Sequence, residues 1–323
     1  MAKPRIVIIS PYLANANNGN WQTAWRWSRF LAKKYEVSLS LEWDGKACDA
    51  MIALHARRSA SAVAAFAATY PTRPLVVALT GTDLYRDILS DEFAQRSLHL
   101  ATKLLVLQAA GLQSLDKKFH PKTQVLYQSA TPLKPFNRQP PKQGRYFDVT
   151  MVGHLRAEKN PGTFMDAAQW LTSARVRLIQ IGGALDPVLG AQAEHTQQQK
   201  PCYQWLGNVA HAATRQRLKR CQLLVNTSNI EGGANVIIEA IMSGVPVLAS
   251  DISGNRGMLG EDYEGYFPCG DSKKLAGMID RAATDASFYS RLQTQCASRV
   301  ALFSPEQERS TLLNIVDRCI ANQ

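Results

Sequence analysis

Short apolar runs alternate with helix-like stretches through the first half of the chain. Apolar runs of this length are typical of buried strands, and apolar residues three or four positions apart are typical of helices. The pattern predicts strands at Arg5–Ser10, Val37–Leu41, Ala50–Leu54, Leu75–Leu79, Lys103–Leu107 and Gln124–Tyr127, and helices at Trp21–Tyr35 and Ser59–Thr69. Because strands and helices alternate, we expect a mainly parallel sheet with helices on both faces.

A second alternating series begins after a proline-rich break. Residues 131–145 contain four prolines and four Lys or Arg, a composition typical of an interdomain linker. Beyond it the pattern predicts strands at Phe147–Val152, Val176–Ile181, Leu223–Asn226 and Val245–Ser250, and a last helix from Ser304 to about Ala321. We therefore predict an α/β protein with domains at 1–145, including the linker, and 146–303, followed by a C-terminal helix at 304–323.

Ligands of open parallel sheets bind beyond the carboxyl ends of the strands. In the first domain, three segments follow predicted strands in this way: Ser10–Asn20, His55–Ser59 and Thr80–Asp83. We expect these three segments to lie near one crevice.

Composition narrows the class of protein. The chain is 46% hydrophobic and 20% charged, as in soluble globular proteins, and no apolar run approaches the roughly 18 residues of a membrane span. The run Ile6–Ile9 is too short for the core of a signal peptide, so we expect a cytoplasmic protein. Its six cysteines include no Cys-x-x-Cys pair, which favours reduced thiols over disulfides or a zinc site.

The net charge of +11 lies almost entirely in the first half of the chain. Residues 1–148 carry 20 Lys and Arg against 10 Asp and Glu, whereas residues 149–323 carry 17 against 16. A positive domain attracts a small anion, an anionic membrane surface or nucleic acid, unless the charges only solvate the surface. We find no zinc-finger or RNA-binding aromatic motif and no clear basic amphipathic helix. We therefore expect neither nucleic-acid binding nor stable membrane association.

Two glutamates eight positions apart, Glu231 and Glu239, flank the start of an apolar helix. A turn that opens a helix presents free N–H groups, which suit a diphosphate, and both carboxylates can accept hydrogen bonds from hydroxyl groups of one bound molecule. Phosphate and hydroxyl groups together indicate a nucleotide sugar. The residues between the first glutamate and the helix are Gly232, Gly233, Ala234 and Asn235, and we expect the glycine pair to be flexible.

This spacing, followed by Ser243–Val247, resembles the donor-site signature of the retaining glycosyltransferases of the GT-B fold, family 4. That family has a Gly-x-x-x-x-x-Lys segment, which Val152–Pro161 matches with Gly153, Arg156 and Lys159. Two further pieces follow in family order, Ile179–Gly183 and Trp205–Val209. The resemblance implies two Rossmann-like domains with mainly parallel sheets facing across a cleft, and a C-terminal helix that returns to the first domain.

The resemblance also implies roles for these residues. Arg156 and Lys159 grip the donor diphosphate and stabilise the negative charge of the leaving group. Glu231 orients the donor sugar, Glu239 holds the ribose, and the N–H groups of residues 233–235 meet the diphosphate. Each role has a structural alternative. Arg156 and Lys159 are then surface cations at a helix start, Glu231 caps the helix, and Glu239 is a solvated side chain. The chain has no Asp-x-Asp pair, so we expect no metal and no other cofactor.

Four further segments resemble a small subgroup of the family, the selenosugar synthases of selenoneine biosynthesis. They are Asn15–Ala24, Leu54–Ala60, Leu79–Asp87 and Gln128–Ala130. This resemblance implies transfer of a sugar from UDP-N-acetylglucosamine or UDP-glucose to selenophosphate, with formation of a carbon–selenium bond and release of UDP. The alternative activity is that of a family-4 glycosyltransferase with a lipid or polysaccharide acceptor.

The same segments contain groups that suit a small anionic acceptor. Arg57 and Arg58 supply positive charge after a strand, and amides before the first helix can bind phosphate at its N-terminus. Selenophosphate needs no general base, and none is obvious in these loops. The candidate acceptor residues are Asn18, Gly19, Asn20, His55, Arg57, Arg58, Thr80, Gly81 and Thr82, where Thr80–Thr82 offers hydroxyl and N–H donors.

Structural alternatives stay open for these residues. Arg57 and Arg58 are surface charges in the alternative interpretation, and Thr80–Asp83 is then a plain turn and helix cap. His55 either contacts the donor sugar, where many family members have a histidine at the position of Thr80, or is a partly buried histidine. We expect the tryptophans of the first helix to belong to the core rather than to a stacking platform; they are Trp21, Trp25 and Trp27.

Overall fold

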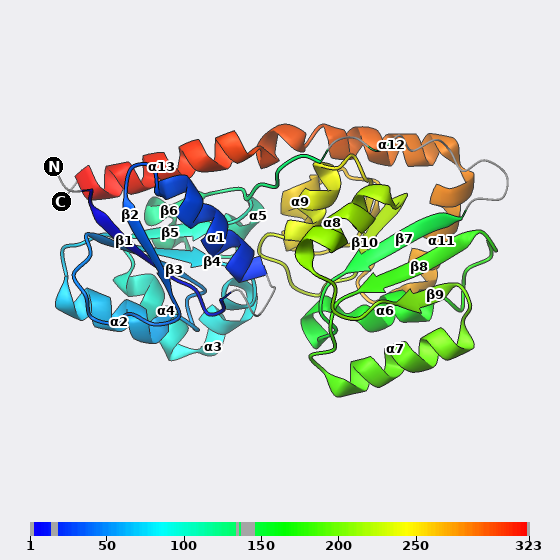
Figure 1. Cartoon of the computed structure of the whole chain (residues 1–323), viewed down its shortest axis with the longest axis horizontal. Coiled ribbons are helices and arrows are strands. Elements are labelled where there is room, and N and C mark those ends of the chain that lie inside the picture. The colour runs from blue at the N-terminus through cyan, green and yellow to red at the C-terminus, as the bar shows by residue number, and fades with distance from the viewer. Residues whose placement is uncertain (1–2, 14–18, 134–135, 137–145, 322–323) are drawn as a thin grey trace. The chain divides into compact units, whose positions relative to one another are not determined.

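The computed structural model describes residues 3–13, 19–133, 136 and 146–321 of the chain. These residues form two compact units (Figure 1). The first unit comprises residues 1–129, 231–234 and 302–323, and the second comprises residues 130–230 and 235–301. Most of the predicted linker, 131–145, lies outside the described residues.

The first unit is built on a sheet of six parallel strands in the order β2-β1-β3-β4-β5-β6. The two central strands consist of buried residues throughout, as expected for a parallel sheet with both faces covered. The strands are β1 (Arg5–Ile9), β2 (Glu36–Ser40), β3 (Ala50–Leu54), β4 (Leu75–Leu79), β5 (Lys103–Val106) and β6 (Thr123–Val125).

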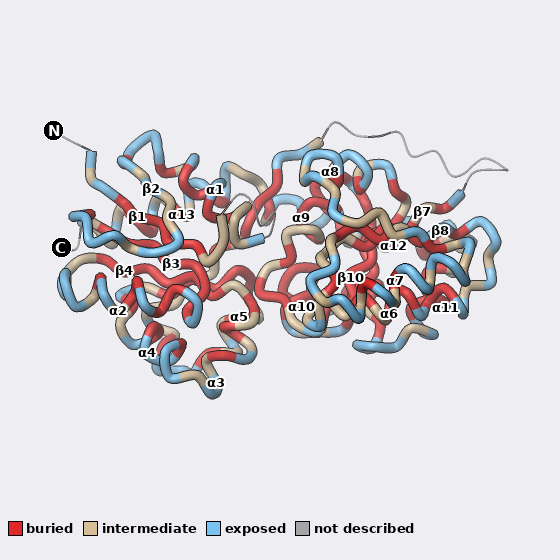
Figure 2. Tube along the Cα trace, turned by 60° about the horizontal axis from the view of Figure 1, so that its bottom comes forward, coloured by how far each residue is buried: buried red, intermediate tan, exposed pale blue. Residues whose placement is uncertain are grey.

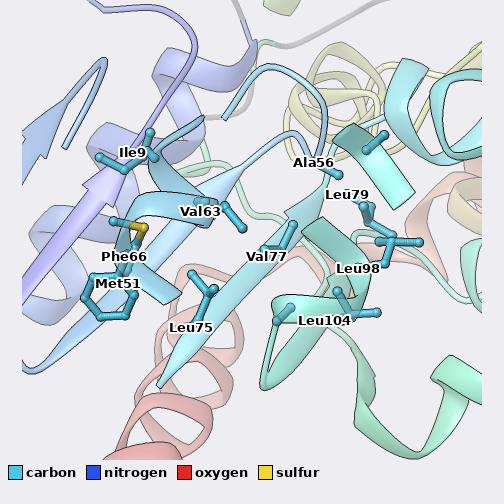
Figure 3. Close-up of a cluster of buried hydrophobic side chains, with 14 of the residues drawn as sticks. Ile9, Met51, Ala56, Val63, Phe66, Leu75, Val77, Leu79, Leu98 and Leu104 are labelled. Carbon is cyan, nitrogen blue, oxygen red and sulfur yellow. The ribbon is translucent and has the colours of Figure 1, made fainter. Parts of the chain in front are cut away.

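Helices cover both faces of this sheet. Successive strand residues point to opposite faces, so neighbouring residues of one strand pack against different helices. Met51 of β3 packs with Phe66 of α2 (Ala60–Thr69) and Leu98 of α4 (Glu92–Leu100) in the cluster shown in Figure 3. Its neighbour Ile52 packs with Trp27 of α1 (Gly19–Leu31) and Ile315 of α13 (Pro305–Ala321). The helix at the end of the chain therefore completes the core of the first unit. The first unit also contains two short α-helices, α3 (Ile88–Ser90) and α5 (Ala110–Gln113).

The second unit contains another six-stranded parallel sheet, in the order β12-β11-β10-β7-β8-β9. The order runs outward in both directions from β7 and β10, so the topological switch point lies between these two strands. The strands are β7 (Phe147–Val152), β8 (Val176–Ile181), β9 (Tyr203–Trp205), β10 (Leu223–Asn226), β11 (Val247–Ser250) and β12 (Tyr266–Phe267).

Seven helices accompany the second sheet in the described residues. They are α6 (Pro161–Ala167), α7 (Pro187–Gln199), α8 (His211–Arg220), α9 (Asn235–Ile241), α10 (Ser253–Leu259), α11 (Ser272–Thr284) and α12 (Ala286–Ala297). Figure 2 shows that burial concentrates on the strands, while the outer surfaces of the helices are exposed. The predicted α/β class with two parallel sheets is confirmed. Among the strands, the prediction missed the two at the edges of the second sheet, β9 and β12.

Candidate functional site

One part of the candidate site lies in the second unit, where β7 and β8 end. The Gly153 N–H donates to the Ile181 carbonyl at 2.8 Å, and the Leu155 N–H donates to the Gly183 carbonyl at 2.9 Å. Gly182 has a φ of +151°, and a Cβ at this position would lie 1.9 Å from the Gly153 oxygen. Glycine is therefore required at residue 182 for the loops after the two strands to approach each other.

The turn that carries Arg156 and Lys159 is held by the segment that follows β10. The Thr227 hydroxyl donates to the Lys159 carbonyl at 2.8 Å, and the Asn229 N–H donates to the Glu158 carbonyl at 2.9 Å. The loops on the two sides of the switch point thus form one hydrogen-bonded framework. Both predicted diphosphate-binding cations are partly buried within it.

The end of this turn is also fixed. Asn160 adopts a left-handed conformation with φ of +44°, and its side-chain amide donates to the Asn229 side chain at 3.1 Å. Asparagine tolerates this conformation better than most residues, and Pro161 then starts α6. The stem of Lys159 packs against Gly153, where a Cβ would lie 3.6 Å from its methylene carbons.

The second predicted glutamate has a partner that the sequence did not indicate. Glu239 lies on α9 and is buried, and its Oε1 is 2.7 Å from Nε2 of His211 at the start of α8. The predicted apolar helix is confirmed, since Ile237, Ile238 and neighbouring residues of α9 are buried. The only sequence signal for His211 was its place two residues after the Trp205–Val209 motif.

The segment 231–234 belongs to the first unit. Its neighbours in that unit explain why residues 232 and 233 are glycines. A Cβ on Gly232 would lie 2.4 Å from the carbonyl carbon of Thr80, and a Cβ on Gly233 would lie 2.8 Å from Oε1 of Gln128. Neither glycine has a positive φ. Our expectation that the pair provides flexibility is thus replaced by a steric reason: backbone approaches Gly232, and side chains of Gln128 and Leu107 approach Gly233. Glu231 and Ala234 are buried at the two ends of the segment.

In the first unit, Asp83 organises the loop after β4. The Thr80 and Gly81 N–H groups both donate to its Oδ1 at 2.9 Å, and the Ala56 N–H donates to its Oδ2 at 2.9 Å. Asp83 is fully buried. Two of the N–H donors that we expected to bind an oxyanion are therefore already used by an internal carboxylate. The sequence signal was present, because an Asp three residues into a strand-end loop is a common acceptor for such N–H groups.

His55 lies at the end of β3 in a strained conformation. It has a φ of +73°, which is uncommon for any residue other than glycine, and its side chain is buried. Its Nε2 is 2.9 Å from the Thr82 hydroxyl, and its two ring nitrogens lie 3.9 Å from Asp83 and 3.8 Å from Asp87. Asp83–Asp87 forms a π-helical turn, a feature that is frequent at functional sites. The strand-end loops after β3 and β4 are thereby joined, as predicted.

The two arginines after β3 differ in their surroundings. Arg57 pairs with Asp91 at 2.9 Å and lies 3.9 Å from Asp87, so neighbouring carboxylates offset its charge. The Arg58 guanidinium lies 5.1 Å from the centre of the Tyr12 ring, and its backbone N–H donates to His55 Nδ1 at 3.3 Å. Both arginines are exposed. Of the two, Arg58 has the charge that is better placed to attract an anion.

The predicted N-terminal segment is partly described. Gly19 and Asn20 begin α1, while Asn18 lies outside the described residues. Thr23, one turn into the helix, donates to the Gly19 carbonyl at 2.8 Å and accepts a hydrogen bond from the Gln128 side chain. The segments Asn15–Ala24 and Gln128–Ala130, singled out in the sequence, thus meet through these two side chains.

One expectation about the tryptophans was wrong. Trp27 is fully buried, as expected, but Trp25 is 46% exposed and stacks on Trp21 with 5.7 Å between ring centroids. Arg29 lies 5.7 Å from the Trp25 ring. The reason is the helical period: α1 buries Thr23, Ala24, Trp27 and Leu31, so residues 21, 25 and 29 lie on a different face.

The described residues offer no alternative centre built on a metal ion or a disulfide. No group of three His, Cys, Asp or Glu side chains in this part of the chain is arranged to hold a metal ion. None of its helices combines the length and apolar character that a bilayer crossing needs. All six cysteines are free thiols. Cys269 donates to Asn229 in the switch-point framework, and burial raises the pKa of its thiol.

Two units with six-stranded parallel sheets, one carrying cations in the loops at its switch point, define a two-domain α/β enzyme of the GT-B class. The chain belongs to the family of glycosyl transferases group 1, whose model matches residues 134–299. A curated relative, glycosyltransferase 1 domain-containing protein 1 of Xenopus tropicalis, is 29% identical over 126 residues. That match covers 38% of this chain and 36% of the relative, so the chain spans about a third of the relative's length.

Solved structures agree with this fold. Sucrose-phosphate synthase from Thermosynechococcus elongatus has a TM-score of 0.78 at 15% identity, over 99% of this chain and 100% of that chain. Anabaena HepE in complex with UDP and glucose has a TM-score of 0.69 at 18% identity, over 99% and 100%. The pneumococcal O-GlcNAc transferase GtfA, in complex with UDP and GlcNAc, has a TM-score of 0.67 at 16% identity, over 84% of this chain and 57% of that chain.

Proposed function

We propose that this glycosyltransferase transfers a sugar from a UDP-sugar, UDP-N-acetylglucosamine or UDP-glucose, to selenophosphate in selenoneine biosynthesis. The products are UDP and a 1-seleno-sugar. The observation that carries the donor half is the framework at the switch point of the second unit. Thr227 and Asn229 hold the turn of Arg156 and Lys159 through backbone carbonyls, so the cations stand on a rigid support. Two similar structures contain UDP, which supports a UDP-sugar donor.

The donor residues act on the leaving group. When the bond between C1 of the sugar and the diphosphate oxygen breaks, negative charge grows on the diphosphate. Arg156 binds phosphate oxygens with its planar guanidinium, and Lys159 adds a point charge, so both stabilise the transition state more than the ground state. Glu231 orients the sugar hydroxyl groups, Glu239 binds the ribose, and the N–H groups of residues 233–235 bind the diphosphate.

The acceptor reacts through selenium. A lone pair of the selenium anion forms the bond to C1 as the diphosphate departs with the electrons of the broken bond, which gives UDP and a sugar bonded to selenophosphate. Addition of water across the phosphorus–selenium bond then yields phosphate and the seleno-sugar. Arg58 attracts the anion, Thr82 and His55 line the strand-end loops, and the first step needs no general base. This half of the proposal rests on the resemblance of the four segments to the subgroup.

The test is mass spectrometry of the purified protein with each UDP-sugar, with and without selenophosphate. We expect a selenium isotope pattern at the mass of the seleno-sugar, and UDP only when both substrates are present. Heat-denatured protein is the control for spontaneous reaction of selenophosphate. Binding of the UDP-sugar without this product would keep the donor assignment and reject selenophosphate as the acceptor.

A second candidate function is transfer to a lipid or polysaccharide acceptor, and exposed apolar side chains of the first unit favour it. Trp25, Leu89 and Phe93 are 46%, 72% and 67% exposed, and exposed apolar side chains can contact an apolar acceptor. A screen of lipid and oligosaccharide acceptors with the same UDP-sugars decides between the candidates. Product with such an acceptor, and none with selenophosphate, would establish this second function.

A further inference from the structure

His211 and Glu239 form a hydrogen-bonded pair at the edge of the candidate donor site. The two side-chain atoms that meet, Nε2 of His211 and Oε1 of Glu239, are 2.7 Å apart. The Glu239 side chain is 11% exposed and the His211 side chain is 38% exposed, so the pair opens to solvent on the histidine side. The orientation of the Glu239 carboxylate is therefore set by a neighbouring side chain before any ligand binds.

The loop before α8 holds His211 in this place. It leaves β9 beside the loop after β8, where the Gly182 N–H donates to the Gly207 carbonyl at 2.9 Å. The Trp205 indole N–H donates to the Gly182 carbonyl at 2.8 Å. Thr214 on the first turn of α8 donates its N–H to the Ala210 carbonyl at 2.9 Å. The position of His211 is thus determined by hydrogen bonds on both of its sides in the chain.

The two carboxylate oxygens of Glu239 differ in their hydrogen bonding. Oε1 is engaged by His211, and among the described residues Oε2 has no hydrogen-bond partner, so it remains for a ligand hydroxyl group. A carboxylate fixed through one oxygen loses less rotational freedom when the other oxygen binds a ligand. A hydroxyl bound to a charged acceptor contributes more than one bound to a neutral acceptor.

We propose that His211 is a positioning residue that fixes Glu239 to bind the ribose hydroxyl groups of the donor nucleotide, and so makes the enzyme prefer ribonucleotides to 2′-deoxyribonucleotides. This inference rests on the proposed UDP-sugar donor. The inference adds two things to that proposal: a preference between two nucleotides and a role for a residue outside the family-like motifs. If His211 had a purely structural role, in which the pair only joins α8 to α9, replacing it would leave the preference between the two nucleotides unchanged.

The test measures binding of UDP and of 2′-deoxy-UDP by titration calorimetry, without any turnover. In the unchanged protein we expect UDP to bind about tenfold or more tightly than 2′-deoxy-UDP, the size of a hydrogen bond to a charged group. In His211→Ala the preference should fall at least severalfold, mainly through weaker binding of UDP. His211→Gln, which keeps an N–H donor, should restore part of the preference. His195→Ala, an exposed histidine of α7 in the same unit, is the matched control and should keep it in full.

The outcomes separate this inference from the proposed function. If the unchanged protein binds no UDP, the donor assignment itself fails, and the inference fails with it. If it binds UDP but His211→Ala keeps the same preference, the positioning role is overturned while the donor assignment stands. Equal weakening of both nucleotides in His211→Ala, with a lower melting temperature, would likewise reduce the pair to a link between helices.

Discussion

Arg26 and Glu308 lie 282 positions apart in the chain and meet in a two-pronged ion pair. Nε of Arg26 is 2.7 Å from one carboxylate oxygen, and Nη2 is 3.1 Å from the other. The same buried carboxylate accepts hydrogen bonds from the Trp27 indole at 2.7 Å and from the Ser129 N–H at 2.8 Å. This one side chain thus joins α13 to α1 and to the end of the segment Gln128–Ala130.

We expect Glu308→Ala to lower the free energy of unfolding by about 3–5 kcal/mol, because it leaves the mostly buried Arg26 without its partner. Denaturant melts of the full chain measure the change. Glu306→Ala, an exposed glutamate on the same helix, is the control and should stay within about 0.5 kcal/mol of the unchanged protein. Equal stability of the two variants would contradict the structural role of Glu308.

Asp83→Asn should damage the loop after β4. The amide has one oxygen, so its nitrogen would face an N–H group of Ala56 or of Thr80 and Gly81, and at least one buried donor would lose its partner. We expect a loss of about 1–3 kcal/mol in stability and a larger relative loss of transfer activity. Asp44→Asn, an exposed control in the same unit, should change neither. A variant with normal activity would show that the loop geometry does not matter for the reaction.

The contact of Gly232 with Thr80 predicts a steric effect. Gly232→Ala places a Cβ 2.4 Å from a backbone carbon, so the segment 231–234 must move and Glu231 with it. We expect a strong fall in kcat/KM for the UDP-sugar. Gly277→Ala in α11 meets nothing within 4 Å and should instead stabilise the protein by about 0.5–1 kcal/mol. Similar kinetics for the two variants would argue against a fixed position of Glu231.

The cations of the switch-point turn should act mainly on the chemical step. We expect Arg156→Ala and Lys159→Ala each to lower kcat about 100-fold to 1,000-fold, as for other groups that stabilise a developing negative charge. Arg156→Lys should recover only part, because an ammonium group cannot bind two phosphate oxygens at once. Arg175→Ala, an exposed arginine of the same unit, is the control. A rise in KM with unchanged kcat would show that the cations only bind the donor.

Arg57 and Arg58 should differ in their effect on the acceptor. We expect Arg58→Ala to raise KM for selenophosphate about tenfold, the effect of a lost hydrogen bond to a charged group, with UDP affinity unchanged. Arg57→Ala should have a smaller effect, because Asp91 and Asp87 already offset its charge. Steady-state kinetics with the selenophosphate concentration varied measure both values. A parallel loss of UDP affinity in Arg58→Ala would count against an acceptor role.

The strands and the fold class could be predicted because they depend on local pattern. A strand such as Leu75–Leu79 is apolar throughout in the sequence and buried throughout in the structure. The motif around Glu231 and Glu239 was equally visible, because a functional segment keeps its residues at fixed spacing along one turn and one helix. The roles of these residues stay predictions.

Contacts between distant segments were not predictable from local pattern. Nothing near Glu308 indicates that it will be buried against Arg26, and nothing near Glu239 indicates His211. The glycine pair at 232–233 suggested flexibility, whereas the nearby backbone of Thr80 shows that the space is filled. Trp25 was predicted to be a core residue and is exposed, because its burial depends on which face of α1 the sheet covers.

The sequence by itself determined the two parallel sheets and the approximate places of their main strands, and it singled out the candidate donor residues as a prediction, because strand length, helical period and motif spacing are properties of neighbouring residues. The tertiary structure decided which carboxylates are held by several internal donors, as for Asp83 and Glu308, and which pair with one side chain, as for Glu239. The physical reason is that a buried charge requires a partner, and the partner comes from whichever segment the fold brings near.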